Sequence, residues 1–344
     1  MRRTVGASEQ AGNAADLEVP SSGPEAGDFA ELVRRHRREL HLLCYRLLGS
    51  FEEAEDHVQD VLLRAWRSRE DFEGRSSVRT WLYRIATNAC LDTLRRDARR
   101  AVPASPGPSA GLGPSVAGMP WLQPYPDHLL DELAADQPGP ETVAVNRETM
   151  SLAFLATIQL LPPRQRAVAI LRDVGGWSAA ETAGLLDMTV PAVNSALQRA
   201  RATLRDQWPG GRLEWAPAAR SDPGQRRLLQ TYIEAHEQAD PEMLIAVLRH
   251  DIRLAISRVG EWRGRDDVAA ALRGGMNSLG RWRVLPIPAN GQPGVAGYVR
   301  RPGESVFVPF VLTLLRFDQG ALVDVAAFEQ PSLFARFGLP AALT

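Results

Sequence analysis

Two short amphipathic segments, separated by a three-residue turn, stand out near the middle of the chain. Ser178 begins the first segment and Glu181 follows three residues later, which is the spacing of a helix-starting capping box. After the turn at 187–189, Thr189 can cap a second helix, and Pro191 is tolerated in its first turn. The apolar stripe of that helix is Val193, Ala196, Leu197, Ala200 and Leu204. The pattern therefore predicts a helix-turn-helix.

The outer face of the second helix carries short hydrogen-bonding groups followed by arginines, which a major-groove reader presents to base edges and phosphates. Its candidate DNA-contacting residues are Val190, Pro191, Ala192, Asn194, Ser195, Gln198, Arg199 and Arg201. In the first helix, Ala180, Ala183 and Leu186 share one face, and Gly184 is expected to let another helix approach. A plain helical hairpin with a solvated face is the alternative, because such patterns also arise by accident.

Three further helices are predicted in the first hundred residues. The first has apolar residues at intervals of three and four, and Gly49 ends it; they are Phe29, Leu32, Val33, His36, Leu40, Leu43, Cys44 and Leu47. The second covers 51–67, with an inner face of Ala54, Val58, Val61, Leu62, Ala65 and Trp66. Its outer face is expected to hold Glu55, Asp56, Gln59, Asp60 and Leu63. In the third, over 81–96 with Val78 ahead of it, Val78, Leu82, Ile85, Ala89 and Leu94 pack inward.

Charge is divided within this helical unit. The helix over 51–67 begins acidic, whereas residues 75–100 are rich in arginine. Either half alone is ordinarily a solvated face. Both halves on one unit indicate a domain whose acidic side binds a basic protein surface and whose arginines bind nucleic-acid phosphates. The affinity of such an arginine face for nucleic acid weakens steeply with salt.

Composition divides the remaining chain. The predicted parts are a disordered 1–28, a helical 29–100, a Pro/Gly-rich linker 101–140, a helical 141–208, a second linker 209–224 and a C-terminal domain 225–337. A helix is expected from Glu141 to Leu161. Because a flexible linker rarely contains Trp, Leu and Tyr together, Trp121 and Tyr125 are expected to anchor the first linker in a groove of another domain.

The C-terminal domain has its own pattern. Two helices that break at Asp240-Pro241 precede an alternating run at 251–257, a short helix at 266–273, and strand-like runs at 282–288, 306–317 and 321–328. A hairpin turn at 318–320 joins the last two strands. Helices followed by a bent antiparallel sheet form an α+β plan.

Overall composition excludes several classes of protein. Net charge is −1, so any nucleic-acid surface must be a local patch, and every basic residue other than histidine is arginine. The two cysteines lie in apolar helical patterns, which favours burial in a reducing cytoplasm. No apolar run approaches the ~20 residues that span a bilayer, and no signal peptide is recognisable. Scattered histidines and the lack of a phosphate-binding glycine loop argue against a metal or nucleotide cofactor.

Two stretches carry a family resemblance. E-D-H-V-Q-D-V-L-L-R-A-W-R followed by G-R-S-S-V-R-T-W-L-Y-R-I-A-T-N-A-C-L-D-T-L-R-R resembles region two of bacterial sigma factors. The stretch from L-P-P-R-Q-R to R-A-R-A-T-L-R is similar to their region four. The extracytoplasmic-function (ECF) branch of the sigma-70 family resembles the chain most, over about Phe29 to Arg205. It implies two all-α domains that bind core RNA polymerase and promoter DNA without catalysis.

The resemblance also implies roles for individual residues. Asp56, Gln59, Asp60 and Leu63 match the surface that grips the clamp of the largest polymerase subunit, and a contact of region four with the flap is expected. The loop of Phe72, Gly74, Arg75, Ser76 and Ser77 matches the one that captures a flipped base of the −10 element. Trp81, Tyr83, Arg84, Asn88, Asp92, Arg95 and Arg96 match the helix that contacts this element. Residues 190–201 match the helix that reads the −35 element.

For Trp81, a purely structural place in the core is an equal alternative, and Tyr83 and Arg84 are the preferred DNA contacts. Extruding a base costs a few kcal/mol of unstacking, which hydroxyls, backbone donors and aromatic or arginine planes must offset.

Residues 225–337 resemble the SnoaL-like branch of the cone fold named after nuclear transport factor two, through R-L-A-I-S-R-V-G-E-W-R-G-R-D-D-V. Some relatives are enzymes, and candidate catalytic groups here are His236, Asp251, Asp318 and Asp324, but no acid/base pair stands out. The domain is therefore expected to tune the sigma factor, beside or in place of an anti-sigma factor, or to sense a small ligand. The alternatives are a SnoaL-like enzyme tethered to DNA and a helix-turn-helix repressor independent of polymerase.

Overall fold

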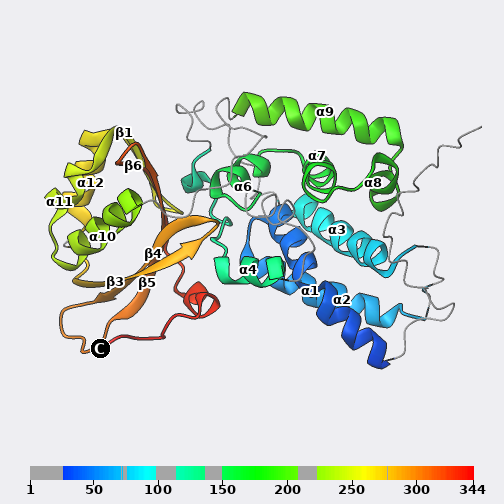
Figure 1. Cartoon of the computed structure of the whole chain (residues 1–344), viewed down its shortest axis with the longest axis horizontal. Helices are drawn as coiled ribbons and strands as arrows, with labels where there is room; N and C mark the ends of the chain where they lie inside the picture. The colour runs from blue at the N-terminus through cyan, green and yellow to red at the C-terminus, as the bar shows by residue number, and fades with distance from the viewer. Residues whose placement is uncertain are drawn as a thin grey trace, which may run out of the picture.

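The computed structural model describes residues 26–70, 72, 76–97, 114–135, 149–207, 223–276 and 278–344. They form a helical lobe and an α+β lobe, side by side in Figure 1. The helical lobe consists of α1 (Ala26–Leu48), α2 (Phe51–Arg67), α3 (Val78–Arg96), η2 (Val116–Gly118), α4 (Asp127–Ala135), α6 (Leu152–Gln159), α7 (Pro163–Ala169), η3 (Ile170–Val174), α8 (Ala179–Leu186) and α9 (Val190–Gln207). The predicted disorder of the N-terminal residues, up to residue 25, lies outside the described residues.

The first helical unit, α1 to α3, forms as the periodicity predicts. Gly49 ends α1 with a φ of +76°, and a Cβ there would lie 3.1 Å from Gln159 and 3.2 Å from Leu122. Ser50 then caps α2 by accepting a hydrogen bond from the backbone N–H of Glu53. Cys44 on α1 and Cys90 on α3 are buried, as expected of small apolar side chains.

The second helical unit, α6 to α9, packs against the first through a buried arginine. The Arg166 guanidinium donates to the carbonyl of Leu47 at the end of α1 and to two oxygens of Gln159 at the end of α6. The prediction of one helix from 141 to 161 is wrong in the described residues. Ser151 caps α6, which begins at Leu152, and residues 141–148 lie outside the description.

The predicted linker at 101–140 is more ordered than expected. Residues 114–135 contain η2 and the helix α4, which the proline-rich composition around them concealed. Tyr125 is 2 % exposed, and Trp121 is half-buried against the same apolar core. The predicted anchoring of this segment is therefore confirmed.

The α+β lobe is built around one sheet of six strands in the order β2-β1-β6-β5-β4-β3. Its elements are α10 (Pro223–Glu237), α11 (Pro241–Ala246), β1 (Leu248–Ile256), β2 (Gly260–Arg263), α12 (Arg265–Gly275), β3 (Arg281–Ala289), β4 (Gln292–Arg300), β5 (Val308–Asp318), β6 (Ala321–Phe328) and η4 (Pro331–Phe337). The expectation of an antiparallel sheet is wrong at one place, because β1 pairs with β6 in parallel. The sequence pattern does not predict strands β2 and β4.

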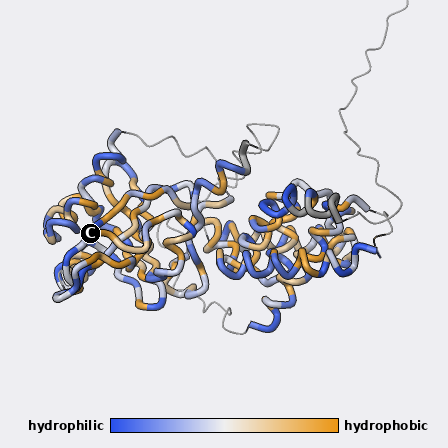
Figure 2. The backbone as a smooth tube through the Cα atoms, turned by 90° about the horizontal axis from the view of Figure 1, so that it is seen from below, coloured by the Kyte–Doolittle hydropathy of each residue, from blue (hydrophilic) through white to orange (hydrophobic). Residues whose placement is uncertain are grey.

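The two faces of this sheet pack against different partners. One face, with Leu254, Trp282 and Val325, closes a core against α10, α11 and α12. The opposite face, with Tyr298 and Phe328, belongs to an apolar core that continues through the linker into the helical lobe. Figure 2 shows hydrophobic backbone stretches, in orange, along the inside of both lobes. The α+β lobe therefore contacts the helical lobe with the face that its own helices do not cover.

Candidate functional site

The outer face of α2 is free in the structure. Asp56, Gln59, Asp60 and Leu63 are all exposed, and the Leu63 side chain is 53 % exposed although it is apolar. An exposed leucine beside carboxylates is typical of a protein-binding surface. Glu55 does not belong to this surface, contrary to the prediction. Its side chain is 14 % exposed because it turns toward α1, where it forms an ion pair with Arg37.

The loop before α3 is held at both ends. The Phe72 ring is buried and packs on Trp81 with ring centroids 5.1 Å apart. Ser77 caps α3 by accepting a hydrogen bond from the backbone N–H of Thr80, and Ser76 and Ser77 are exposed. Gly74 and Arg75 lie outside the described residues. Trp81 is 8 % exposed, so in this arrangement it is a core residue, which is the alternative to a DNA contact.

The outer face of α3 is basic and exposed. Arg84, Asn88 and Arg96 project from it, in agreement with the helical spacing. Asp92 accepts a hydrogen bond of 2.9 Å from Arg95, which reduces the number of arginines available for other contacts. This face therefore carries a row of exposed arginines, of which Arg95 is paired with Asp92.

Tyr83 corrects the sequence prediction. Its side chain is 7 % exposed rather than outward, and its ring packs on Trp177, at the start of the helix-turn-helix, with centroids 5.0 Å apart. Its hydroxyl donates to Glu39 of α1, and Arg79 lies over both rings. Burial raises the pKa of Tyr83 above its ordinary value. The second helical unit covers this residue, so DNA cannot reach it in this arrangement.

The helix-turn-helix forms as predicted, and the residues predicted to cap its two helices do so. Ser178 and Glu181 make the capping box of α8, and Asp187 turns the chain in the left-handed region. Thr189 accepts a hydrogen bond from the N–H of Ala192 at the start of α9. The buried residues of α9 are Val193, Ala196, Leu197, Ala200 and Leu204. Ala180 is exposed, and a Cβ on Gly184 would meet nothing within 4 Å, so the predicted close approach of a helix there is wrong.

The outward face of α9 is uncovered. Val190, Pro191, Asn194, Gln198, Arg199 and Arg201 are exposed, and Ala192 and Ser195 are half-buried. Arg199 donates to the Ser195 hydroxyl at 2.7 Å, and Arg201 forms two hydrogen bonds with Asp173. Part of the basic charge that the sequence offers for phosphates is thus already paired within the unit.

A hydrogen-bonded cluster joins the lobes, and the sequence pattern points to only one of its members, Tyr125. Asn290, in the turn between β3 and β4, donates to the Tyr45 hydroxyl of α1 and to the Met150 carbonyl. Its side-chain oxygen accepts from the N–H of Tyr125, whose carbonyl accepts from the N–H of Asn290. Asn290 is 1 % exposed. The sequence signal that could have located Asn290 is the Asn-Gly pair at 290–291, because this pair is typical of a hairpin turn.

The α+β lobe offers no acid/base pair among the candidate residues His236, Asp251, Asp318 and Asp324. Arg249 binds both Asp251 and Asp318, and Arg253 binds Asp324 with two hydrogen bonds of 2.8 Å. His236 stacks on an aromatic ring and contacts a backbone carbonyl, and burial lowers its pKa to about 4. These groups stabilise the lobe.

The described part of the chain lacks the features of a metal site and of a membrane span. None of its clusters of His, Cys, Asp or Glu reaches the three side chains that a metal ion needs. Within the same residues, each helix is too short or too polar to cross a lipid bilayer.

Comparison with known proteins identifies the two helical units. A model of sigma-70 region 2 matches residues 32–100, and a model of sigma-70 region 4 matches residues 151–204. The ECF RNA polymerase sigma factor SigW of Bacillus subtilis (strain 168) is 32 % identical over 179 residues, covering 52 % of this chain and 88 % of SigW.

Other similarities extend over the α+β lobe. The ECF RNA polymerase sigma factor SigG of Mycobacterium tuberculosis (strain CDC 1551 / Oshkosh) is 39 % identical over 326 residues, covering 92 % of this chain and 85 % of SigG. The crystal structure of the M. tuberculosis extracytoplasmic function sigma factor SigJ has a TM-score of 0.54 at 19 % identity, covering 91 % of this chain and 99 % of that one. The chain therefore belongs to the ECF sigma factors of the sigma-70 family, non-enzymatic transcription initiation factors that bind core RNA polymerase and promoter DNA.

Proposed function

We propose that this sigma factor binds polymerase through α2, the −10 element through α3 and the loop before it, and the −35 element through α9. The observation that carries the proposal is the exposure of polar and charged residues on α2, α3 and α9, around a helical core that is otherwise closed. Figure 1 shows α9 on the side of the lobe away from α2. The separation suits a protein that spans two promoter elements while holding an enzyme.

The polymerase-binding surface is Asp56, Gln59, Asp60 and Leu63. Its carboxylates suit a basic partner, and Leu63 at its C-terminal end supplies apolar area, which the clamp of the largest subunit would cover. Region four is proposed to contact the flap. Both contacts would take place in the cytoplasm, where the reduced state of the two cysteines also fits.

Promoter contacts are proposed on α3 and α9. Arg84, Asn88, Arg95 and Arg96 would lie along the −10 element, with Ser76 and Ser77 beside the extruded base. Trp177 must leave Tyr83 before that residue can take part. On α9, Asn194, Ser195, Gln198 and Arg199 would face the major groove of the −35 element.

The α+β lobe is proposed to tune these activities. The cluster around Asn290 links it to α1 and to the linker, so that the lobe influences how the two sigma units sit together. An anti-sigma factor or a small ligand acting on the lobe would use the same route. This lobe leaves the proposed polymerase surface uncovered.

The test is transcription in vitro with core polymerase, using the full chain and an Asp60→Ala variant. Asp60 is exposed, so the fold is expected to survive while capture of core polymerase falls about tenfold, and promoter-dependent transcripts fall with it. Glu70→Ala is the matched control, because its carboxylate is 82 % exposed just beyond α2 and outside the proposed surface.

Equal capture of core polymerase by the wild type and Asp60→Ala would contradict the assignment of the α2 surface. A chain shortened after residue 210 separates the role of the α+β lobe. If it transcribes at the same level and from the same promoters as the full chain, the tuning role is rejected.

The two alternatives from the sequence are not supported. Sigma factors are not enzymes, and the polar groups of the cone are engaged in ion pairs and ring contacts. A repressor that acts without polymerase would not need the exposed surface of α2.

A further inference from the structure

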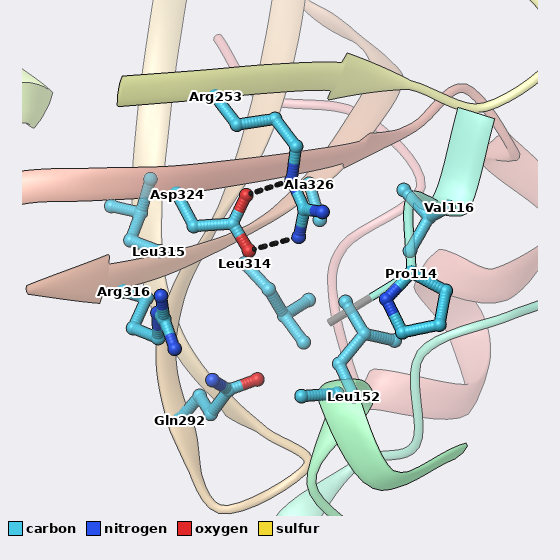
Figure 3. A pocket seen from close by; sticks show the side chains of 11 residues that line it. Pro114, Val116, Leu152, Arg253, Gln292, Leu314, Leu315, Arg316, Asp324 and Ala326 are labelled. Carbon is cyan, nitrogen blue, oxygen red and sulfur yellow. Dashed lines mark hydrogen bonds and ion pairs between the residues drawn. The ribbon is translucent and has the colours of Figure 1, made fainter. Parts of the chain in front are cut away.

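Arginines on the outer face of the sheet, which α10 to α12 do not cover, differ in how well their charge is balanced. Near the helical lobe, Arg253 donates two hydrogen bonds of 2.8 Å to Asp324 (Figure 3). The negative charges of Asp318 and Asp324 also act on Arg316. The guanidinium groups at this place therefore face carboxylates.

Three arginines at the ends of β3 and β4, away from the turn that joins these strands, have fewer carboxylates around them. Arg281 and Arg283 share one face of β3, and Arg281 is directly opposite Arg300 of β4. In the part of the chain that the structure describes, neither Arg281 nor Arg300 forms an ion pair. Arg283 has one, with Glu237 at 3.9 Å, and this carboxylate also accepts from the N–H of Val284. The three residues form an arginine patch with an excess of positive charge.

The ring of Phe307 supports two members of the patch. The guanidinium carbon of Arg300 lies 4.7 Å from the ring centroid, and that of Arg283 lies 5.7 Å from it. Phe307 is 5 % exposed, and its backbone exchanges two hydrogen bonds with Leu343, so the ring belongs to a fixed segment. A guanidinium held over a ring loses less conformational freedom when it binds a ligand. The patch is therefore preorganised.

This arrangement of charge works against the stability of the sheet. Like charges directly opposite one another on antiparallel strands destabilise the pair, and Arg281 is opposite Arg300. Charged side chains on an edge strand prevent unwanted strand pairing, and β3 is an edge strand. That reason accounts for Arg281 and Arg283 but not for Arg300, because β4 lies inside the sheet. A bound polyanion would offset the repulsion among all three.

The surroundings of the patch favour duplex DNA as that polyanion. A protein interface has an apolar centre, but the exposed large apolar side chains among the described residues are Leu63, Val190 and Val259, and none of them belongs to β3, β4 or β5. Single strands bind through bases stacked on open aromatic rings, and the Phe307 ring is buried. Duplex phosphates need neither feature, and a sigma factor meets them at every promoter.

We propose that the arginine patch is an additional DNA-binding surface, which binds the phosphates of duplex DNA without reading the sequence. Guanidinium groups bind phosphate oxygens through charge-assisted hydrogen bonds. The patch lies near the mark of the C-terminus in Figure 1, on the side of the α+β lobe away from the helical lobe. It would give this lobe a direct contact with DNA, and the inference does not depend on the contacts proposed for α3 and α9.

Fluorescence anisotropy of a labelled duplex without promoter elements, titrated with the full chain at several salt concentrations, tests the proposal. The double variant Arg281→Gln/Arg283→Gln changes two exposed positions, so the fold is expected to survive. Its affinity should fall about tenfold at low salt, and the slope of log affinity against log salt should decrease by about 2. Arg226→Gln/Arg227→Gln removes the same charge from exposed positions on α10 and should bind like the wild type.

Equal affinity and equal salt slope for the wild type and the patch variant overturn the proposal. Unchanged DNA binding together with new self-association of that variant assigns the arginines to protection of the edge strand instead. Should the double variant fail to fold, Arg281→Gln alone takes its place: a slope smaller by about 1 is expected, and an unchanged slope overturns the proposal.

Two further measurements separate this surface from its rivals. Poly-glutamate that competes as well as unlabelled duplex at equal charge rejects the assignment to DNA, and weaker competition supports it. The preference for a promoter duplex over the duplex without promoter elements reports on α3 and α9 alone. The patch variant should keep this preference, and its loss contradicts binding without sequence readout. A wild type that lacks the preference argues against the proposed promoter contacts and leaves the test of the patch intact.

Discussion

Region two is held by two interfaces of different chemistry. Toward region four, Arg79 lies over the rings of Tyr83 and Trp177 and reaches Glu39, and its own side chain remains 45 % exposed. Toward the linker and the α+β lobe, the side chain of Asn290 joins three chain segments through direct hydrogen bonds and is 1 % exposed. The contact between α3 and α8 is thus a cation over two packed aromatic rings at the edge of water, whereas the contact with the α+β lobe is a sealed polar cluster.

The difference bears on how the molecule would open. The interface with region four covers Tyr83, so it has to separate if this residue is to meet DNA. The interface with the α+β lobe leaves the proposed polymerase surface of Asp56, Gln59, Asp60 and Leu63 exposed, so this interface can persist if polymerase binds there. The half-exposed contact of Arg79 suits a part that moves, and the buried cluster around Asn290 suits a part that stays; the buried Arg166 would have to give way as well if α6 to α9 moved as one body.

Asn290→Ala should have the largest effect, by weakening the interface between region two and the α+β lobe. It leaves the Met150 carbonyl and the N–H of Tyr125 buried without their partner, and it places alanine at a φ of +55°. With about 1–3 kcal/mol for each unsatisfied group, the lobes should lose about 4 kcal/mol of docking stability. Hydrogen exchange at the backbone amides of β3, β4 and α1 measures this loss.

Gln319→Ala serves as the control for backbone strain. Gln319 also has a positive φ, 48°, but it lies in the exposed turn between β5 and β6. It should lose about 1 kcal/mol and leave the exchange of α1 unchanged. If both variants behave alike, the Asn290 side chain does not hold the lobes together.

Lowering the pH should weaken the linker interface next. His41 is buried beside Tyr125, and burial lowers its pKa to about 4, with Glu55 opposing. The unfolded chain takes up a proton near pH 6.5 and the folded chain only near pH 4, so stability is complete above pH 6.5 and declines below it. At pH 5 the loss is about 2 kcal/mol.

Urea unfolding at pH 7 and pH 5 measures the decline. His236 has a pKa of about 4 for the same reason, but it lies in the other core of the α+β lobe. The two histidines should contribute about equally, so His41→Gln and His236→Gln should each remove roughly half of the pH dependence. Full pH dependence in His41→Gln would show that this histidine does not couple the linker to protons.

Arg79→Ala should loosen region four by a smaller amount. The substitution removes an ion pair of 3.0 Å with Glu39 and two ring contacts at 4.8 and 5.0 Å from the guanidinium carbon. A half-exposed pair and such contacts together contribute about 1 kcal/mol. Faster hydrogen exchange in α8, with no change around Asn290, is the expected result. Faster exchange around Asn290 with no change in α8 would contradict the assignment of Arg79 to the interface with region four.

Gly184→Ala should change neither interface and slightly stabilise region four. Its Cβ would point into open space in the helix α8, so alanine removes backbone entropy from the unfolded chain without a clash. A gain of about 0.7 kcal/mol in unfolding free energy is expected, from thermal melting of the full chain. A loss of stability would mean that α8 has a neighbour at this glycine after all.

The sequence predicts what depends on local pattern and misses what depends on distant packing. The caps at Ser178 and Thr189 and the buried stripe of α9 follow from spacing alone, and all of them form. Tyr83 has the same helical spacing as an exposed residue, but Trp177, almost a hundred residues later, covers it. Periodicity on one helix contains no information about a partner from another unit.

Strand β4 shows the same limit. Pro293, Gly294 and Gly297 weaken any strand prediction. In the sheet, however, a Cβ on Gly297 would lie 3.0 Å from Trp282 and from Val311, and one on Gly294 would lie 2.8 Å from a backbone oxygen. These glycines are strand residues because neighbouring strands need the space, which only the assembled sheet reveals. The role of Asn290 is hidden in the sequence for a similar reason, since its partners come from three segments.

The place of β6 in the sheet also governs the order in which a growing chain can fold. This strand lies between β1 and β5, although it is the last to be made. Both sigma regions can leave the ribosome and fold while the sheet still lacks its central strand. Each new molecule therefore passes through a period in which its sigma regions exist without a finished lobe beside them.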